Sequence, residues 1–359
     1  MRILALLIGG NNIANYALIE YFKKDEKFGF DKVCLIYTKE SKDSAENIIS
    51  LQNGVEFLKC ELEDARNMTK IKDKISNFLS SIDISFIHLN YTGGTKPMSV
   101  GAFLAIDGLE CKKRFSDISP DSSKLTFANG EEYPQDSSID KNIALDIKSL
   151  YKLHGIELIK HQKEVSEFYS EEFVSYLIQK SIKHKEYKSF WDIWDSRDIK
   201  NFDYKSSLKD APVTFDIDDV NLKSLQNFIR GRWLEEYIFD TLKDEEFTDI
   251  AWNVEGRIKQ RDFELDLVIT KGHKSYIISC TTSTTLRDVK QKAFEASIRA
   301  EQIGGIRAKP ISISLLGGEK LENIKYDVKN YVGKTNFEFI GRDEVKNKDK
   351  LKNMLKSIF

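Results

Sequence analysis

Two groups of residues in this sequence are of types, and at spacings, that could do chemistry. The first is a loop between an apolar run and a helical pattern, and it consists of Thr92, Gly93, Gly94, Thr95 and Lys96. Glycines let backbone N–H groups approach a ligand closely, the start of a helix carries about half a positive charge, and Lys96 adds a whole one. The loop is therefore suited to an anion, most naturally a phosphate or a nucleotide.

The same loop has a plainer interpretation, because a pair of glycines is often only a tight turn. What favours a ligand is Pro97, which fits the first position of a helix that we expect from Met98 to Gly108. Neither the phosphate-binding pattern GxxxxGK[ST] nor the dinucleotide pattern GxGxxG is present. The loop after the first expected strand, Gly9 to Asn12, should lie at the same edge of a parallel sheet and add further amide donors.

The second group consists of carboxylates in and before the pattern FELDLVI. Glu264 and Asp266 share one face of an expected strand, opposite its apolar residues. On the preceding helix, Glu235 and Glu236 are placed so that one of them could reach the same ion. Hard oxygen ligands of this kind suit Mg²⁺ or Mn²⁺. The plainer interpretation is that strand carboxylates simply face water.

The composition limits what surrounds these groups. A chain of 359 residues is too long for one small core, so two domains are the natural expectation. The net charge is only −2, so there is no overall positive field and any nucleic-acid binding must be local. No window is apolar for the ~18 residues of a membrane span, and the four scattered cysteines argue against disulfides and structural zinc. We expect a cytoplasmic protein with no membrane association.

The first part of the chain alternates strands and helices. Continuous apolar runs are typical of strands buried on both faces, and segments with helical spacing separate them. The expected strands are residues 3–10, 32–38, 55–62 and 84–90. This alternation predicts an α/β fold with a doubly wound parallel sheet. Residues 118–140 are expected to be loops or a small hairpin.

The rest of the chain has a different pattern. Residues 141–215 are helical and rich in aromatic and charged residues, and we interpret them as a helical connector. An amphipathic helix at 221–244 then precedes three strands, a helix that stops at Gly304, a further strand and a closing helix. The order α-β-β-β-α-β predicts a second domain with an antiparallel meander. The expected units are residues 1–145, 146–217 and 218–359.

The first unit resembles the CARF sensor domains of type III CRISPR systems. The resemblance rests on a Rossmann-like order of elements with NYTGGTKPMSVGA after the fourth strand, and it covers roughly residues 1–145. It implies binding of a cyclic oligoadenylate, by family habit cyclic tetra-adenylate, across the twofold axis of a homodimer. The residues that it implies as ligand contacts are Gly9, Gly10, Asn11, Asn12, Asn90, Thr92, Gly93, Gly94, Thr95, Lys96 and Met98.

The last unit resembles the PD-(D/E)xK nuclease half of CARF-fused CRISPR ancillary nucleases. The segments RGRWLEEYIFDTL, FELDLVIT, YIISC and RAEQIGGIRAKPISIS carry the resemblance, over about residues 220–315. It implies that Glu235 and Asp266 bind Mg²⁺ or Mn²⁺, that Glu264 supports them, and that metal-activated water attacks a phosphodiester of DNA or RNA. Together the two resemblances imply an antiviral nuclease that a cyclic oligoadenylate switches on.

One departure from the nuclease pattern leaves the activity open. Where the pattern has (D/E)-x-K, this chain has Ser279 and Thr281, so the expected site residues are Glu235, Glu264, Asp266, Ser279 and Thr281. A threonine hydroxyl supplies no positive charge, which by analogy with losing one electrostatic donor is worth about 10²–10³ in rate. Another cation could take the lysine's place, and the candidates are Lys259, Arg261, Lys290 and Lys292. The alternative is a CARF sensor whose degenerate nuclease fold binds nucleic acid or a partner without cutting.

Other residues have plain interpretations. His88, in an apolar strand, is expected to be buried and hydrogen-bonded, and the four tryptophans are expected to be packing residues. The basic run from Lys180 to Lys188 suits a solvated helix face, although it could guide a nucleic-acid backbone. Two further functions stay open: slow cleavage of the cyclic ligand by the sensor itself, helped by Thr95 or Lys96, and a nucleotide-binding metabolic enzyme.

Overall fold

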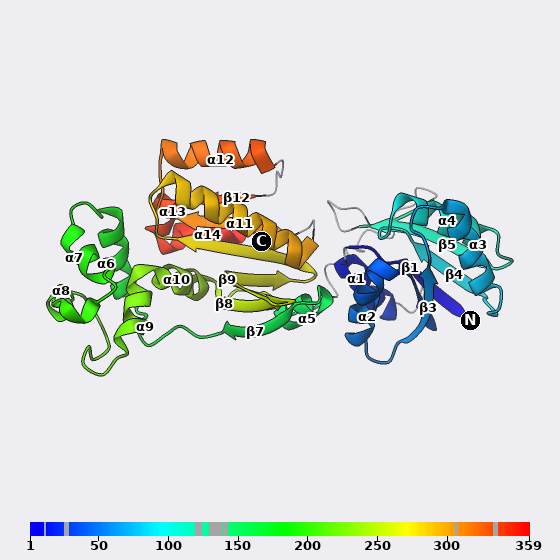
Figure 1. Ribbon diagram of the computed structural model, residues 1–359, viewed down its shortest axis with the longest axis horizontal. Coiled ribbons are helices and arrows are strands. Elements are labelled where there is room, and N and C mark those ends of the chain that lie inside the picture. Colours follow the sequence, from blue (N-terminus) through cyan, green and yellow to red (C-terminus); the bar gives the residue numbers. More distant parts are fainter. Residues whose placement is uncertain are drawn as a thin grey trace.

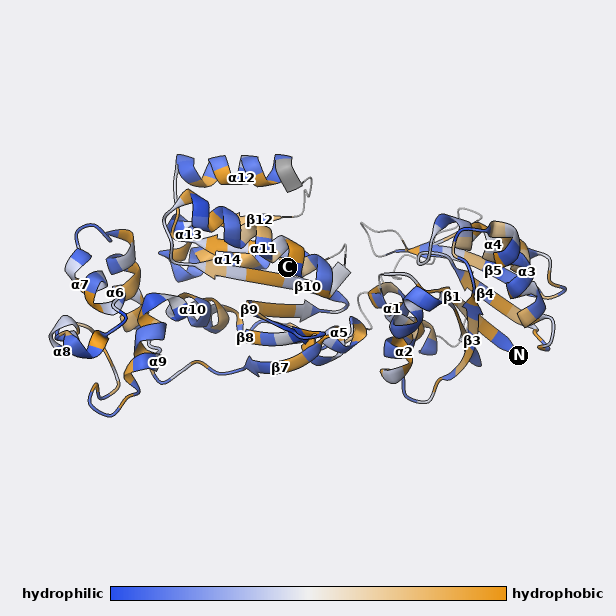
Figure 2. Cartoon of the chain, viewed as in Figure 1, coloured by the Kyte–Doolittle hydropathy of each residue, from blue (hydrophilic) through white to orange (hydrophobic). Residues whose placement is uncertain are grey.

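The computed structural model describes residues 1–10, 12–24, 29–118, 124–128, 139, 143–305, 308–332 and 337–359. Asn11, one of the predicted ligand contacts, and most of the region 118–140 lie outside the described residues. The described chain forms two six-stranded sheets, one in each half of the sequence (Figure 1). Figure 2 shows several strands in the middle of each sheet as largely hydrophobic, whereas the helices alternate hydrophilic and hydrophobic residues.

The first sheet is mostly parallel. Its strands are β1 Arg2–Leu7, β2 Lys32–Thr38, β3 Glu56–Leu62, β4 Phe86–Asn90, β5 Lys112–Ile118 and β6 Leu125–Phe127, in the order β3-β2-β1-β4-β5-β6. Neighbours from β3 to β5 pair in parallel, and β6 pairs antiparallel with β5. The predicted parallel sheet is therefore confirmed. The sequence pattern did not reveal β5, because its residues are mostly charged and only partly buried.

Helices cover both faces of this sheet, and they are α1 Asn12–Lys23, α2 Lys42–Ser50, α3 Met68–Leu79 and α4 Lys96–Asp107, with the short helix η1 Lys39–Ser41 before α2. Alternate residues of β1 enter two different cores. Leu4 and Leu6 pack with α1 and α2, and Ile3 and Ala5 pack with α3 and α4. Burial on both faces explains why this strand is an unbroken apolar run.

The second sheet is mixed. Its strands are β7 Glu157–Gln162, β8 Asp249–Ile258, β9 Arg261–Lys271, β10 Lys274–Thr281, β11 Lys309–Ser314 and β12 Glu338–Ile340, in the order β12-β11-β10-β9-β8-β7. Strands β8, β9 and β10 form the predicted antiparallel meander, and β11 adds to β10 in parallel. The predicted α/β fold is therefore confirmed, and the parallel pairing of β11 and β12 makes the second sheet mixed.

The helices of this half are α10 Trp233–Leu242, α11 Leu286–Gly304, α12 Glu319–Val332, α13 Arg342–Val345 and α14 Lys348–Ile358. The single helix expected at 221–244 is divided into α9 Leu222–Asn227 and α10 by a π-helical turn, Phe228–Arg232, which is kinked at Gly231. A glycine inside a helical pattern is a common place for such a break.

The region 146–217 differs from the helical connector expected from its sequence. It begins with α5 Ile147–Leu153 and then forms β7, which pairs antiparallel with β8 as an edge strand of the second sheet. A cluster of helices follows at the end of the molecule away from the first sheet (Figure 1), and it comprises α6 Glu171–Ile182, α7 Lys188–Trp194, η3 Ile199–Asn201 and α8 Tyr204–Ser207. These helices share one core with α10 and the second sheet. The exact domain boundaries stay a prediction.

Helix α5 lies where the two halves meet. Tyr151 in α5 stacks on Phe263 in β9 with ring centroids 6.2 Å apart, and the core around it includes residues of both sheets. On the other side, the Asn12 side-chain amide at the start of α1 donates a 2.7 Å hydrogen bond to the carbonyl of Leu153. This short helix therefore connects the first strand-end loop with the strand that carries the predicted carboxylates. In the described part of the chain, none of the helices combines the length and apolar character needed to cross a membrane.

Candidate ligand loop and candidate nuclease site

The predicted ligand loop joins β4 to α4 at the carboxyl end of the first sheet. Thr95 has extended backbone angles and its side chain accepts a hydrogen bond from the amide of Met98, so it is the N-cap of the helix. The helix therefore begins at Lys96, and Pro97 takes its second position instead of the predicted first. Lys96 is exposed beside this helix start, so a full positive charge adds to the partial charge of the helix end.

The glycines of this loop are required by close packing. A β-carbon on Gly93 would overlap the carbonyl oxygen of Leu7, and Gly94 has a φ of +75°, which disfavours any other residue. A β-carbon on Gly9 would lie 2.9 Å from the amide nitrogen of Gly94. The loops after β1 and β4 therefore touch each other at one edge of the sheet, as the order of strands predicted.

The predicted contact residues do not all face that edge. Gly10, Gly94, Thr95 and Lys96 are exposed, and Thr92 and Gly93 are partly exposed. Asn12, Asn90 and Met98 are at most 3% exposed. Packing therefore divides the predicted set into residues that a ligand can reach and residues that lie beneath them.

The buried asparagines hold the loops in place. The Asn90 side-chain amide donates to Ser116 Oγ at 3.0 Å, and its oxygen accepts from the amide of Thr92 at 3.1 Å. Thr92 in turn donates its hydroxyl proton to the carboxylate of Asp117, at 2.7 Å. Strand β5, which the sequence pattern did not reveal, therefore holds the ligand loop in position through Ser116 and Asp117. We assign Asn90 a positioning role.

The predicted nuclease site is built around Asp266, in the middle of β9. Its Oδ2 accepts hydrogen bonds from Ser279 Oγ at 3.2 Å and from the Cys280 amide at 2.6 Å, both on the neighbouring strand β10. Its Oδ1 faces the ammonium group of Lys292, from α11, at 3.9 Å. Asp266 is 7% exposed, and these contacts hold the orientation of its buried carboxylate.

Glu235, from α10, completes a pair of acids with Asp266. Burial raises the pKa of Glu235 well above its usual value, and the neighbouring charges of Asp266 and Glu264 raise it further. Burial also raises the pKa of Asp266, although Lys292 opposes the shift. In the described structure Glu235 Oε2 is buried without a hydrogen-bond partner. Two acids that repel each other, one with an unsatisfied buried oxygen, are a donor set that a divalent cation would satisfy.

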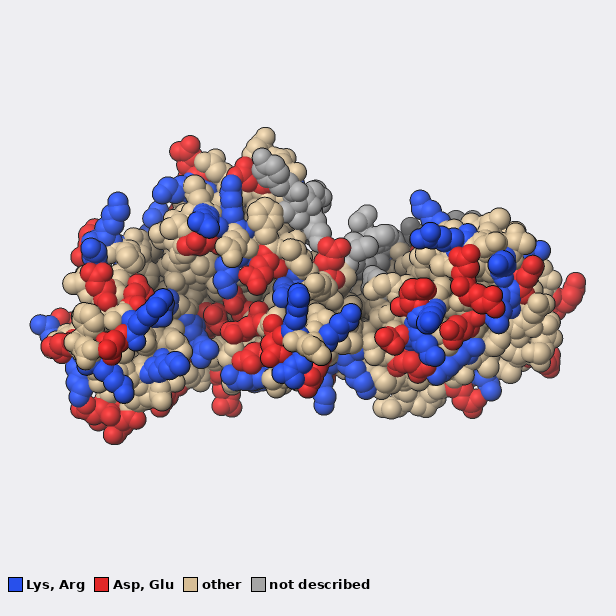
Figure 3. All heavy atoms as spheres, in the orientation of Figure 1, with Lys and Arg blue, Asp and Glu red and all other residues tan. Residues whose placement is uncertain are grey.

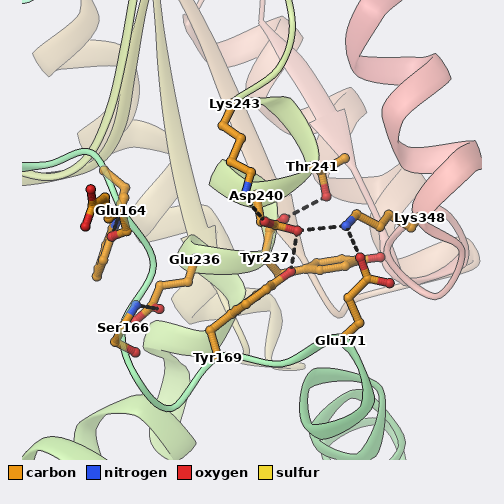
Figure 4. Close-up of polar contacts among 11 residues, drawn as sticks. Glu164, Ser166, Tyr169, Glu171, Glu236, Tyr237, Asp240, Thr241, Lys243 and Lys348 are labelled. Carbon is orange, nitrogen blue, oxygen red and sulfur yellow. Dashed lines mark hydrogen bonds and ion pairs between the residues drawn. The ribbon is translucent and has the colours of Figure 1, made fainter.

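The neighbouring acid, Glu236, is not part of this pair. Figure 4 shows its side chain turned toward the loop before α6, where Oε2 accepts a 2.7 Å hydrogen bond from the Ser166 amide. One turn later on α10, Asp240 accepts from the hydroxyl of Tyr169 at 2.9 Å and from the ammonium group of Lys348 at 2.7 Å (Figure 4). These contacts fasten the helical cluster and α14 to α10. Of the two glutamates, Glu235, which the resemblance implies as a metal ligand, lies close enough to Asp266 for this carboxylate to raise its pKa.

The residues present fit a Mg²⁺ or Mn²⁺ ion. Within the described residues, no three His, Cys, Asp or Glu side chains are grouped closely enough to hold an ion by themselves. Mg²⁺ does not require such a cage, because it usually keeps several waters and binds through one or two carboxylates and substrate phosphates. Glu235 and Asp266 are such a pair, and the exposed Glu264 lies close enough to raise the pKa of Glu235.

The structure also separates the four cations that could replace the missing lysine. Lys259 and Arg261 lie at the tight turn between β8 and β9, five or more residues from Asp266 along the strand, or about 16 Å. Lys290 forms an ion pair with Asp327 of α12. Lys292 forms an ion pair with Asp266 in the described structure. Burial opposes the charge of Lys292, but Asp266, Glu295 and Glu235 together raise its pKa. Thr281, at the usual lysine position, bonds to the Ser283 amide at 3.2 Å.

The fold and the two candidate sites define a nucleotide sensor joined to a nuclease-like domain. Residues 3–118 match the Card1 CARF domain family, and residues 223–357 match the Card1-like endonuclease domain family. The chain therefore belongs to the CARF-domain CRISPR ancillary nucleases, with a Card1-type CARF domain followed by a Card1-like endonuclease domain. Both resemblances predicted from sequence are confirmed.

Solved structures with the same fold cover the whole chain. Can2 from Sulfobacillus thermosulfidooxidans, solved in complex with cyclic tetra-adenylate, is similar over 100% of both chains with a TM-score of 0.73 and 16% identity. Protein VC1899 from Vibrio cholerae is similar over 99% of this chain and 98% of its own, with a TM-score of 0.68 and 16% identity. The search of curated proteins by sequence gave no match.

Proposed function

We propose that this protein is a metal-dependent nuclease of type III CRISPR defence that a cyclic oligoadenylate activates. The observation that carries the proposal is the group formed by Glu235, Asp266 and Lys292 in the endonuclease domain of a chain that begins with a CARF domain. A buried pair of acids beside a lysine has little structural purpose, since it costs desolvation that its own ion pairing barely offsets. It has a clear purpose in phosphodiester cleavage.

The proposed activator is cyclic tetra-adenylate, and its site is the exposed part of the loops after β1 and β4. Backbone amides, the start of α4 and Lys96 suit phosphates. The structural neighbour Can2 was solved with that same ligand. A ring with twofold symmetry is best met by two copies of one loop, so we propose a homodimer.

The surface of α3 and α4 supports this homodimer. It exposes four large apolar side chains, which are Met68, Val100, Phe103 and Leu104, each between 37% and 46% exposed. The visible face of the molecule mixes acidic and basic side chains (Figure 3). An apolar group beside a proposed twofold ligand site is what a self-complementary interface needs.

In the proposed reaction, Glu235 and Asp266 hold Mg²⁺ or Mn²⁺, with Glu264 in support. A bound ion of this kind supplies an activated water and stabilises charge on the phosphate. The chain's own residues do the rest. Ser279 and the Cys280 amide fix the orientation of Asp266. Lys292 supplies the positive charge that Thr281 lacks, and it would neutralise charge that develops on the scissile phosphate. DNA, RNA or both are the proposed substrates.

A cleavage assay tests the proposal. Full-length protein is incubated with labelled DNA or RNA and Mn²⁺ or Mg²⁺, with and without cyclic tetra-adenylate. We expect cleavage only with both metal and activator, and a loss of about 10²-fold or more in Asp266→Asn. The matched control is Asp262→Asn, because Asp262 lies on the same strand but is exposed and pairs with Arg257 at 2.6 Å. Equal activity in the two variants contradicts the proposed site.

A thermal-shift panel of cyclic oligoadenylates tests the sensor half separately. We expect cyclic tetra-adenylate to stabilise the wild type and to stabilise Lys96→Ala much less. Lys112→Ala serves as the control, since Lys112 is exposed at the opposite end of the parallel strands. Stabilisation by mononucleotides instead of cyclic oligoadenylates would favour a metabolic enzyme.

A binding-only protein is the second candidate function, and Ser279 and Thr281 are the observation that favours it. In that case the endonuclease domain binds nucleic acid or a partner after activation, and Lys292 only balances the charge of buried acids. Absence of cleavage by the wild type under every metal and activator condition, together with retained nucleic-acid binding, is the result that selects this function.

A further inference from the structure

A cavity of about 330 Å³ lies between the helical cluster and the segment that leads from β10 into α11. Its walls come from α6, α7, Arg230 in the π-helical turn, and the hydroxyl-bearing residues Thr282–Thr285. The volume is at the lower end of the range for sites that bind small ligands, roughly 300–1,000 Å³. None of the residues assigned above to metal binding or to the cyclic ligand lines it.

One polar side chain of this cavity has no partner in the described structure. Ser181, in the last turn of α6, is 4% exposed, and its hydroxyl makes no hydrogen bond. Leaving a buried hydroxyl unsatisfied costs stability, whereas alanine at this place would not. Because Ser181 lines the cavity, a ligand with hydrogen-bonding oxygens would satisfy it.

The cavity also offers a cation that a phosphate could use. Arg230 lies on its wall, with Nε 3.4 Å from a carboxylate oxygen of Asp195, which lines the cavity too. Both side chains are more than half exposed, so this ion pair is weak and leaves the other guanidinium donors free for a second acceptor. A guanidinium with two donors to spare is suited to bidentate contact with a phosphate.

A flat aromatic surface lines the same cavity as Arg230. The exposed ring of His184 stacks on the buried indole of Trp191, with centroids 5.5 Å apart and an angle of 6°. The same segment carries the basic run noted from sequence, which comprises Lys180, Lys183, Lys185 and Lys188. Asp195 is the acidic residue among the described residues that line the cavity, and Asp288 accepts a 2.9 Å hydrogen bond from the hydroxyl of Ser283, which also lines it.

The cavity is next to the proposed nuclease site. Thr282, on its wall, donates to the carbonyl of Arg230 at 3.3 Å and follows three residues after Ser279, which bonds to Asp266. Three residues of extended chain span about 10 Å. That distance equals about three steps of a B-form strand, at roughly 3.4 Å per step. A strand whose scissile phosphate lies at Asp266 would therefore pass this cavity within a few nucleotides.

We propose that this cavity binds the sugar-phosphate backbone of the nucleic-acid strand that the protein cuts, a few nucleotides from the scissile bond. Arg230 contacts a phosphate, and the Ser181 hydroxyl donates a hydrogen bond to an oxygen of the same backbone. His184 covers the site on the solvent side. This inference rests on the proposed nuclease function, which it extends by naming where the substrate is held. Phosphate contacts of this kind fix the position of a strand without reading its sequence.

The test separates binding from cleavage. Fluorescence anisotropy of a fluorescein-labelled oligonucleotide is measured with full-length protein and cyclic tetra-adenylate in EDTA, over a range of salt concentrations. We expect Arg230→Ala to weaken binding about tenfold and to lower the slope of log affinity against log salt by about 0.7–0.9. Ser181→Ala should weaken binding several-fold while its melting temperature stays equal to or above that of the wild type. Arg197→Ala, the same change at an exposed arginine outside the cavity, should bind as the wild type does.

The possible outcomes distinguish this inference from the proposed function. If the wild type binds and cuts nucleic acid but Arg230→Ala and Ser181→Ala bind it with unchanged affinity and salt slope, the cavity assignment is overturned and the nuclease proposal stands. If the wild type binds without cutting and both variants weaken binding, the cavity assignment holds and the nuclease proposal fails. If the wild type binds no oligonucleotide, both fail.

Discussion

The most decisive prediction concerns Lys292, which we propose as the replacement for the lysine missing at Thr281. Its ammonium nitrogen lies 3.9 Å from Asp266 Oδ1. Two unit charges about 4 Å apart interact by about 4 kcal/mol at the effective dielectric constant near a protein surface. The Lys292 side chain is 46% exposed, so solvent screening reduces this to about 2 kcal/mol.

If Lys292 interacts as strongly with the charge that develops on the scissile phosphate, losing about 2 kcal/mol of transition-state stabilisation corresponds to roughly 30-fold in rate. A cation that acts mainly on the transition state is worth more, about 10²–10³ by comparison with a lost oxyanion donor. We therefore expect Lys292→Ala to cut between roughly 30-fold and 1,000-fold more slowly than the wild type, at saturating activator and Mn²⁺. Lys290→Ala should be close to the wild type, because Lys290 is on the same helix but pairs with Asp327.

A rescue experiment makes this prediction sharper. Placing the lysine back on the strand, as Thr281→Lys in the Lys292→Ala background, should restore much of the lost rate. A second readout does not depend on cleavage: the rise in melting temperature on adding Mn²⁺ should persist in Lys292→Ala and disappear in Asp266→Asn. The reasoning is refuted if Lys292→Ala loses less than about fivefold in rate, or if it loses its response to Mn²⁺ as completely as Asp266→Asn does.

Four further predictions follow from individual residues. Asn12→Ala removes the hydrogen bond to Leu153 of α5, so it should weaken activation by cyclic tetra-adenylate in cleavage assays while titration still shows ligand binding; unchanged activation would contradict a link through α5. Gly93→Ala forces a methyl group into the carbonyl of Leu7 and should cost about 1–3 kcal/mol, seen as a lower melting temperature and lost stabilisation by the ligand, and a wild-type melting curve would speak against the packed loop. Burial, assisted by Arg114, lowers the pKa of His88 to about 3, below its unfolded value of about 6.5. The neutral ring therefore contributes stability that is present above about pH 6.5 and is lost as the pH falls, by about 2–3 kcal/mol at pH ~4.5. His88→Asn should reduce the fall of the melting temperature between about pH 6.5 and pH 4.5. If the melting temperatures of the wild type and the variant fall equally over this range, the predicted contribution of His88 is refuted. Phe103→Glu places a charge on the exposed apolar surface of α4 and should shift the protein from dimer to monomer in analytical ultracentrifugation. A variant that stays dimeric would contradict this interface.

Several features of the fold and of the candidate sites follow from sequence because they depend on neighbours along the chain. The alternation of apolar runs and helical spacings predicted the parallel sheet, since burial on both faces requires continuous apolar strands. The glycines and Pro97 predicted a loop that opens a helix, although the helix begins two residues earlier than expected, at Lys96. The alternation in β9 placed Glu264 and Asp266 on one face. His88 was predicted to be buried and hydrogen-bonded, and it is 2% exposed with Nε2 2.7 Å from Ser116 Oγ.

Other features depend on residues far apart in the sequence, and only the tertiary structure decided them. Strand β7 is half-exposed and has no strong pattern of its own, so its pairing with β8 could not be read from the residues of the segment. The residue pattern left Glu235 and Glu236 as equal candidates, and only the family resemblance named Glu235; the packing of α10 places Glu235 beside Asp266 and Glu236 on the Ser166 amide. Four cations were equal candidates until the packing of α11 against β10 brought Lys292 to the site. Periodicity fixes the face on which a side chain lies, but the partner across that face is set by how distant elements pack.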